Sequence, residues 1–167
     1  ITFSIHEWRC FMSKKGNFKF LPFNYIKGEE IDLIIEQKIP ENKVKGFVPT
    51  YCYAINLTGT NLTIGTIDLR IGNNTLTYYG GHIGYGIDKK HRGHHYAAKA
   101  CKLLGKVALA HGMDELIITC NPENIASQKT CTRIGAELIE IVDLPTDTDM
   151  YLEGERQKCI YKWRIFS

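Results

Sequence analysis

The sequence has no long apolar run and little excess charge. Its apolar runs, such as 107–110 and 116–118, extend over a few residues each, whereas a helix that crosses a membrane needs about 20. Basic residues number 21 and acidic residues 18, and 44% of the 167 residues are hydrophobic. This composition is typical of a soluble globular protein and excludes wholesale disorder. We therefore predict one domain over residues 1–167, with no membrane partner.

The six cysteines form no C-x-x-C pair, which argues against a zinc site and against dithiol redox chemistry. We therefore predict no metal site. No basic-then-apolar leader opens the chain, and an even cysteine count without a secretory signal is typical of reduced thiols in a cytoplasmic protein. The expected location is the cytoplasm.

Two common phosphate-binding motifs are also missing. The sequence contains no G-x-x-x-x-G-K-[ST] segment and no G-x-G-x-x-G segment after a first strand. Their absence argues against the two usual ways in which a Gly-rich loop holds a nucleotide.

The positive charge is concentrated in one segment. Residues 88–111 carry six lysines or arginines and one acid, and the same segment holds four of the six histidines. A basic cluster on a nearly neutral chain points to one anionic ligand. The segment lacks the interleaved aromatic residues that stack on bases, so we predict no nucleic-acid partner.

Apolar spacing predicts the elements of the N-terminal half. Apolar residues at 31, 34 and 35 predict a short helix over Ile31–Gln37 that Pro40 ends. Strands are predicted over 51–56, 63–71 and 82–88, with a simple turn at 72–74 before the last of them.

The C-terminal half alternates strands and helices. Small and apolar residues recur every three or four positions from Ala97 to Ala108, which predicts a helix. A strand over 115–120, a helix over about 124–134 and strands over 137–142 and 158–165 follow, the last two joined by a polar loop. The order predicts a mixed α/β (α+β) sheet domain with one parallel crossover.

The most specific segment runs from His82 to Ala100, where a strand leads through a basic, Gly-containing turn directly into a helix. The free N–H groups and the positive dipole end at the start of a helix bind anions. Arg92 adds a forked donor in the turn. We therefore expect an anion site there.

Two segments resemble the GNAT superfamily of N-acetyltransferases. Residues 92–97 (RGHHYA) fit its [RQ]-x-x-G-x-[GA] signature at Arg92 and Ala97, with His95 in place of the usual Gly. Downstream, 124–127 (NIAS) and 133–136 (RIGA) are similar to the family's N-x-x-[AS]…k-x-G-F segment. The similarity covers residues 50–142, fits the final strand, and is greatest to the branch that includes ribosomal-protein N-terminal acetyltransferases. Residues 1–49 match by position only.

The resemblance implies a mostly antiparallel central sheet, flanked by helices, in which the parallel strands 82–88 and 115–120 splay apart. It also implies acetyl-CoA as co-substrate, with the pyrophosphate on the turn and the pantetheine chain along the end of the first of these strands. The cofactor contacts implied in this way are Gly86, Ile87, Asp88, Arg92, Gly93, His94, His95, Tyr96, Ala97 and Asn124.

A general base must take a proton from the amine before the amine attacks the thioester. His82 lies near the position of a strand-borne Glu in related enzymes, and an imidazole titrates close to neutrality. Asp68, on the polar face of the preceding strand, is the second candidate. The alternative to a catalytic role is structural in both cases: His82 would be a histidine packed in the strand or facing solvent, and Asp68 a carboxylate that is solvated or paired with an arginine.

The family's proton donor to the CoA thiolate is usually a Tyr seven residues after the Asn, and Cys131 occupies that position here. Cys131 is therefore a candidate acid, or else a small buried side chain. Tyr85 and Tyr96 are alternative donors.

The predicted function is direct transfer of an acetyl group from acetyl-CoA to a small-molecule or peptide amine. The missing Tyr keeps open a second interpretation, a non-catalytic acyl-CoA-binding or sensor module. The polar loop 143–155 carries five acids that either face a cationic acceptor or are simply solvated. Peptide N-termini, lysines, polyamines, aminoglycosides and amino-sugars remain open as acceptors, as does a homodimer.

Overall fold

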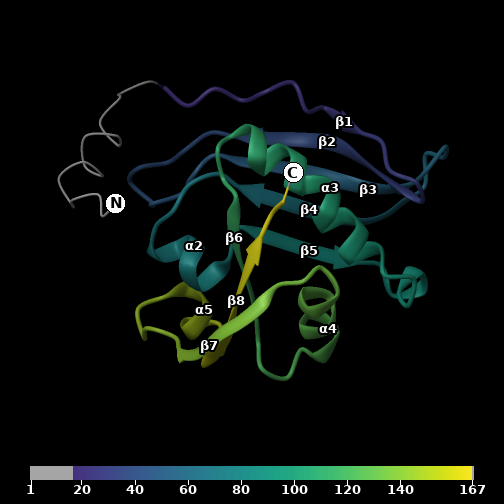
Figure 1. Ribbon diagram of the computed structural model, residues 1–167. Helices are drawn as coiled ribbons and strands as arrows, with labels where there is room; N and C mark the ends of the chain where they lie inside the picture. Colours follow the sequence, from purple (N-terminus) through teal and green to yellow (C-terminus); the bar gives the residue numbers. More distant parts are fainter. Residues whose placement is uncertain (1–16, 167) are drawn as a thin grey trace.

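The computed structural model describes residues 17–166 and contains two antiparallel sheets with helices packed against them (Figure 1). The first sheet has the order β1-β2-β3-β4-β5, and the second has the order β6-β8-β7. The mixed α+β architecture expected from the sequence is confirmed. The strands are β1 Tyr25–Ile26, β2 Ile31–Ile39, β3 Thr50–Leu57, β4 Thr63–Arg70, β5 Ile83–Ile87, β6 Glu115–Cys120, β7 Glu137–Asp143 and β8 Gln157–Arg164. The helices are α2 Thr75–Gly80, α3 Tyr96–Ala110, α4 Ile125–Arg133 and α5 Asp149–Leu152, with a 3₁₀ turn, η1, at Lys89–His91.

Helix α3 supplies the centre of the core. Its small and apolar face, including Ala100, Leu104 and Val107, is fully buried and packs against the five-stranded sheet. The predicted period of three and four residues is confirmed, because these residues share one side of the helix. Within residues 17–166, no helix is long and apolar enough to cross a membrane.

The prediction of a helix over Ile31–Gln37 is wrong. The segment is β2, which pairs antiparallel with β3 along its length and with β1 at its start. The pairing register shifts between Ile35 and Gln37, so a bulge accommodates two adjacent apolar residues that break strict alternation. A short apolar run does not distinguish helix from strand, and its β-branched isoleucines favour the strand.

Two helices were missed where turns or loops were expected. Helix α2 follows the predicted turn, and Asn74 caps it by accepting from Thr77 N–H while the Thr77 hydroxyl accepts from Asn74 N–H. Helix α5 lies in the polar loop and is capped by Thr148. Both helices are short, so their apolar periodicity is too weak to detect.

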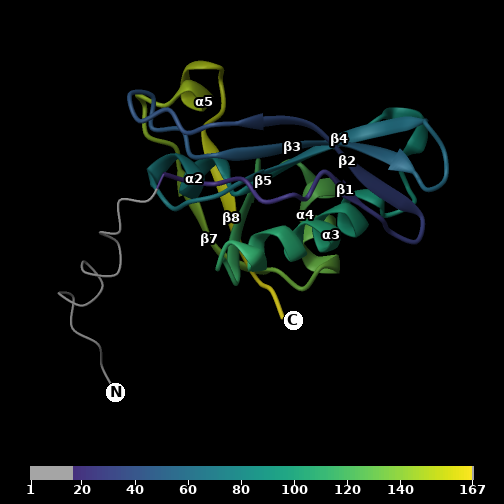
Figure 2. The ribbon, with the colours of Figure 1, turned by 90° about the horizontal axis from the view of Figure 1, so that it is seen from above.

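The two faces of the five-stranded sheet are covered by different elements. Helices α3 and α4 lie on one side and α5 on the other (Figure 2). Strands β5 and β6, predicted to splay apart, belong to different sheets. Their backbones are joined at the start of β5, where His82 N–H donates to the Ile117 carbonyl over 2.7 Å. Beyond that point no ladder joins them in the described part of the chain.

Candidate active site

A pocket of about 460 Å³ opens beside the end of β5, between the turn that precedes α3 and one side of α4. Eight of the ten predicted cofactor contacts line it, whereas Asp88 and His94 do not. The eight are Gly86, Ile87, Arg92, Gly93, His95, Tyr96, Ala97 and Asn124. The structure thus brings together residues from β5, the turn and α4 that are up to 38 positions apart.

The turn before α3 has a left-handed backbone at two positions. Gly93 has φ 88°, and His95, the N-cap of α3, has φ 62° and ψ 24°. Among residues 17–166, His95 is the one non-glycine with a positive φ. Arg92 Nε donates to the Ile87 carbonyl over 2.9 Å, which ties the turn to the end of β5. The first amides of α3 face this pocket with the positive end of the helix dipole.

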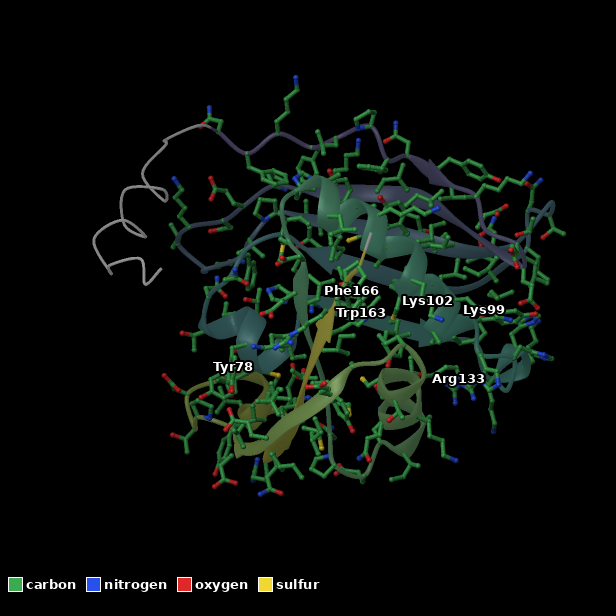
Figure 3. All side chains as sticks on the ribbon, in the orientation of Figure 1. Tyr78, Lys99, Lys102, Arg133, Trp163 and Phe166 are labelled. Atoms are coloured by element: carbon green, nitrogen blue, oxygen red, sulfur yellow. The ribbon has the colours of Figure 1, made fainter. Side chains whose placement is uncertain are left out.

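Positive charge surrounds this pocket on both sides. Lys129 and Arg133 of α4 line it together with Arg92, and no acid is among the described lining residues. Arg133 lies on the same side of the molecule as Lys99 and Lys102 of α3 (Figure 3). Sequence reasoning missed Lys129 and Arg133, although their spacing of four residues places both on one helix face.

His91 is a further pocket residue that sequence reasoning did not single out. It lines the pocket, and its Nε2 is buried without a hydrogen-bond partner in the described residues. Buried polar atoms are rarely left unpaired. A polar group in the pocket would satisfy this nitrogen, which fits the polar chain and phosphates of CoA.

Two hydroxyls meet at the wall of the pocket. Tyr85 Oη lies 2.6 Å from Ser127 Oγ, and both residues line the cavity. Ser127 sits in the first turn of α4, where its N–H donates to Asn124 Oδ1 over 3.1 Å. Burial raises the pKa of Tyr85, so its hydroxyl is protonated in the resting protein and can act as a donor.

Cys131 lies behind this wall. It is fully buried in the core and does not line the pocket. Burial raises the pKa of its thiol to about 12. This placement supports the interpretation of Cys131 as a small packing residue. Tyr96 lines the pocket at the start of α3, and its ring stacks on His94 at 5.2 Å.

A second pocket, of about 580 Å³, lies on the opposite face of the five-stranded sheet. Its floor is formed by β3 and β4, and its walls come from the end of β2, the connection between β2 and β3, α2 and α5. The lining residues are Ile39, Gly46, Phe47, Val48, Thr50, Cys52, Asp68, Arg70, Leu76, Thr77, Gly80, Thr148, Asp149 and Met150. Of the five acids in the predicted polar loop, only Asp149 reaches it.

Asp68 lies on the floor of the second pocket. Its Oδ2 is 2.8 Å from Arg70 Nη2, and its carboxylate lies over Gly84 of β5, where a Cβ would be 3.2 Å from Asp68 Oδ1. Burial raises the pKa of this carboxyl, and Arg70 partly offsets that rise. The predicted Asp–Arg pair is therefore present, and it stands on β4, which pairs with β5, the strand that borders the first pocket.

His82 occupies neither of these two pockets. It is buried, its Nδ1 accepts from Ile117 N–H over 2.8 Å, and its Nε2 faces the Gly72 carbonyl and Asn73 Oδ1 at 3.0 and 2.9 Å. These partners place the proton on Nε2, and burial lowers the pKa of the ring. The structure does not bring His82 together with Asp68 or Arg92, and its ring clamps β5 to β6.

Comparisons with known proteins agree with this geometry. A family model described as an acetyltransferase (GNAT) domain matches residues 6–137. No curated protein matches the sequence. A proposed ribosomal-protein-serine acetyltransferase from Vibrio cholerae has a similar fold, with a TM-score of 0.63, 16% identity and coverage of 87% of this chain and 99% of that one.

Two similar folds were solved with ligands. The ribosomal L7/L12 α-N-protein acetyltransferase RimL, in complex with CoA, has a TM-score of 0.61 and 14% identity, with coverage of 84% of this chain and 98% of that one. The microcin C7 self-immunity acetyltransferase MccE, in complex with acetyl-CoA and AMP, has a TM-score of 0.55 and 19% identity, with coverage of 70% and 61%.

Proposed function

Because the chain belongs to the GNAT acetyltransferase family, which uses acetyl-CoA as co-substrate, we propose that it transfers the acetyl group directly to an amine. The observation that carries this proposal is the pair of pockets on opposite faces of the sheet: β5 borders the first pocket, and its pairing partner β4 forms part of the floor of the second. One pocket offers donors and positive charge, and the other offers a carboxylate.

The first pocket would hold the cofactor. The amides that follow Arg92 would bind the pyrophosphate, and Lys129 and Arg133 would balance its charge from the α4 side. Within residues 17–166, the Gly86 and Ile87 backbone has β4 as its one partner strand, because β6 belongs to the other sheet. The Ile87 carbonyl already accepts from Arg92 Nε, so it is the outward N–H groups of this edge that could donate to a pantetheine carbonyl, and one of them could polarise the thioester carbonyl.

We propose Asp68 as the general base. A carboxyl whose pKa is raised toward neutrality is better matched to taking a proton from an ammonium group. His82 has both ring nitrogens in hydrogen bonds, so the geometry gives its predicted role as base no support. The amine would lose a proton to Asp68, directly or through water, and its nitrogen would form a bond to the acetyl carbon as the C–S bond breaks.

The leaving thiolate would take a proton from the Tyr85–Ser127 hydroxyl pair. Both hydroxyls border the cofactor pocket, whereas the Cys131 thiol is buried behind it. Donation of this proton leaves the hydroxyl pair one proton short, and a proton taken from water at the opening of the pocket would restore it.

The test of this function is turnover in two variants. Asp68→Asn should lower kcat/KM for amine acetylation by about 10²–10⁴, the usual contribution of a general base, with unchanged affinity for CoA. The matched control is Glu41→Gln, which neutralises a carboxylate outside both pockets. Release of free CoA thiol measures the rate, and calorimetric titration measures the affinity.

Two results would count against this proposal. A rate of Asp68→Asn close to that of the unmodified protein would pass the role of base to ordered water or to His82. Tight binding of acetyl-CoA without turnover of any amine would favour the non-catalytic acyl-CoA-binding module instead.

A further inference from the structure

The second pocket is apolar where it opens. Five of its lining side chains are hydrocarbon or thioether groups that come from β2, the connection between β2 and β3, α2 and α5. They are Ile39, Phe47, Val48, Leu76 and Met150. Phe47 is 50% exposed and Leu76 is 39% exposed, which is unusual for large apolar side chains gathered at one opening. An apolar ligand would remove this surface from water.

The same pocket has few charges. Its ionisable lining residues are Asp68 on the floor, Asp149 at the opening, Arg70 and the half-buried thiol of Cys52. Arg70 is already committed, because it pairs with Asp68 and donates to the carbonyls of Gly80 and Gly81 at 3.2 and 2.9 Å. The pocket therefore presents a net negative charge suited to a single ammonium group.

The hydroxyl groups that line the second pocket already form hydrogen bonds within the chain. The Thr50 hydroxyl donates to the Val48 carbonyl, the Thr77 hydroxyl bonds to the Asn74 backbone, and the Thr148 hydroxyl donates to the Pro145 carbonyl. A peptide acceptor would bring amide groups that find few polar partners in this lining, and unpaired buried amides are costly.

Polycationic acceptors fit equally poorly. The other acids of segment 143–155 do not line the pocket: Asp143 accepts from Gln157, Glu155 pairs with Lys158, and Asp147 and Glu153 lie outside the lining. Among the described lining residues, Asp149 is the acid left at the opening. A polyamine or an aminoglycoside would keep further ammonium groups against apolar walls, with the desolvation cost that this carries.

We propose that the acceptor is a primary monoamine on an apolar body, of the arylalkylamine class. Its ammonium group lies at Asp68, and its hydrocarbon or aromatic part packs between Phe47, Leu76 and Met150. This inference rests on the proposed acetyl transfer. A volume of about 580 Å³ accommodates an acceptor of this size.

The experiment compares acceptors and variants in the full chain. With acetyl-CoA saturating, kcat/KM for 2-phenylethylamine should exceed that for spermidine, for kanamycin and for a peptide with a free N-terminal Ser by about tenfold or more. Phe47→Ala should raise KM for 2-phenylethylamine about tenfold and leave KM for acetyl-CoA unchanged. KM for methylamine, which lacks the apolar body, should be the same in Phe47→Ala as in the unmodified protein.

Val44→Ala is the matched control. Val44 is on the same connection between β2 and β3 but is 99% exposed and does not line the pocket. The KM values of Val44→Ala for both substrates should therefore equal those of the unmodified protein. Phe47 is half exposed, so its truncation leaves the fold intact, which thermal melting checks.

The outcomes separate this inference from the proposed function. Turnover that favours spermidine, kanamycin or the peptide would overturn the acceptor class and keep the acetyl transfer. Calorimetric binding of 2-phenylethylamine that weakens in Phe47→Ala, without turnover, would support the pocket chemistry and overturn the transfer. Failure of 2-phenylethylamine either to bind or to react would overturn the acceptor class.

Discussion

At the scale of single residues, His95 combines a functional position with backbone strain. It caps α3 at the cofactor pocket with φ 62°, a conformation in which Cβ approaches the following carbonyl oxygen. Glycine adopts this conformation without that contact. His95 stands where the resembling signature has Gly, so this chain carries a local cost at its turn.

We therefore predict that His95→Gly raises the free energy of unfolding by about 1 kcal/mol. Urea denaturation followed by circular dichroism measures this change. His94→Gly, one position earlier and without a positive φ, is the control and should lower stability instead. An unchanged or lower stability in His95→Gly would show that the imidazole makes a compensating contact.

At the scale of elements, the cap of α2 links two walls of the second pocket. Asn74 accepts from Thr77 N–H at the start of α2, and its Nδ2 donates to the Gly46 carbonyl over 2.8 Å. Gly46 and Leu76 both line that pocket. The single side chain of Asn74 therefore fixes both the helix start and its distance from the connection between β2 and β3.

Asn74→Ala should lower the free energy of unfolding by about 1 kcal/mol, the usual cost of losing an N-cap. It should also raise KM for the amine and leave KM for acetyl-CoA unchanged, because the cofactor pocket lies on the other face of the sheet. Steady-state kinetics with each substrate varied in turn gives both constants. The control is Thr60→Ala, which removes a hydrogen bond to the Leu57 carbonyl in an exposed turn and should change neither KM. Equal rises of both KM values in Asn74→Ala would refute the local role of Asn74.

The elements differ in how much of them could be predicted from the sequence. Helix α3 and the turn at 92–97 were predicted because their signals are local: a regular apolar period, and a basic turn leading into it. Strand β2 was predicted as a helix because its bulge is set by pairing with β3, which no local pattern contains. The second pocket could not be predicted, because residues from 39 to 150 meet there only after both sheets have formed.

Prediction of the catalytic residues was limited in the same way. His82, Asp68 and Cys131 were chosen by position relative to motifs. Asp68 has its partner Arg70 nearby in sequence, but the contacts that decide among the candidates join residues far apart in sequence. Ile117, which fixes the tautomer of His82, is 35 residues away, and Ser127, which meets Tyr85, is 42 residues away. These contacts decide which groups have protons to exchange, and they come from tertiary packing.

At the scale of the whole molecule, His82 joins the two sheets. Its ring accepts from Ile117 N–H of β6 and faces the Gly72 carbonyl before α2. Burial lowers the pKa of the ring, and Arg70 acts in the same direction. The folded protein therefore binds this proton less readily than the unfolded chain, in which histidine titrates near pH 6.5.

The free energy of unfolding should consequently fall as the pH drops below about 6.5, by up to about 1.4 kcal/mol per pH unit from this one group. His82→Gln should lower the free energy of unfolding at pH 8. It should also reduce the slope by up to about 1.4 kcal/mol per pH unit, which is the contribution of one proton. The pKa of His111 is lowered by burial as well, so part of the slope should remain. Chemical denaturation from pH 5 to 8 gives the slopes, with His94→Gln as an exposed control, and identical slopes in His82→Gln and the unmodified protein would contradict the assignment.

The placement of the two pockets on opposite faces of the sheet also bears on the order of substrate binding. With cofactor and acceptor entering as proposed, neither would have to leave before the other arrives, and each product would depart by the route of its precursor. The proposed reaction would then proceed through a ternary complex. A single compound that joins an arylalkylamine to CoA through a short linker would occupy both entrances at once. Its affinity would exceed that of either half, because the second half binds at a high effective concentration.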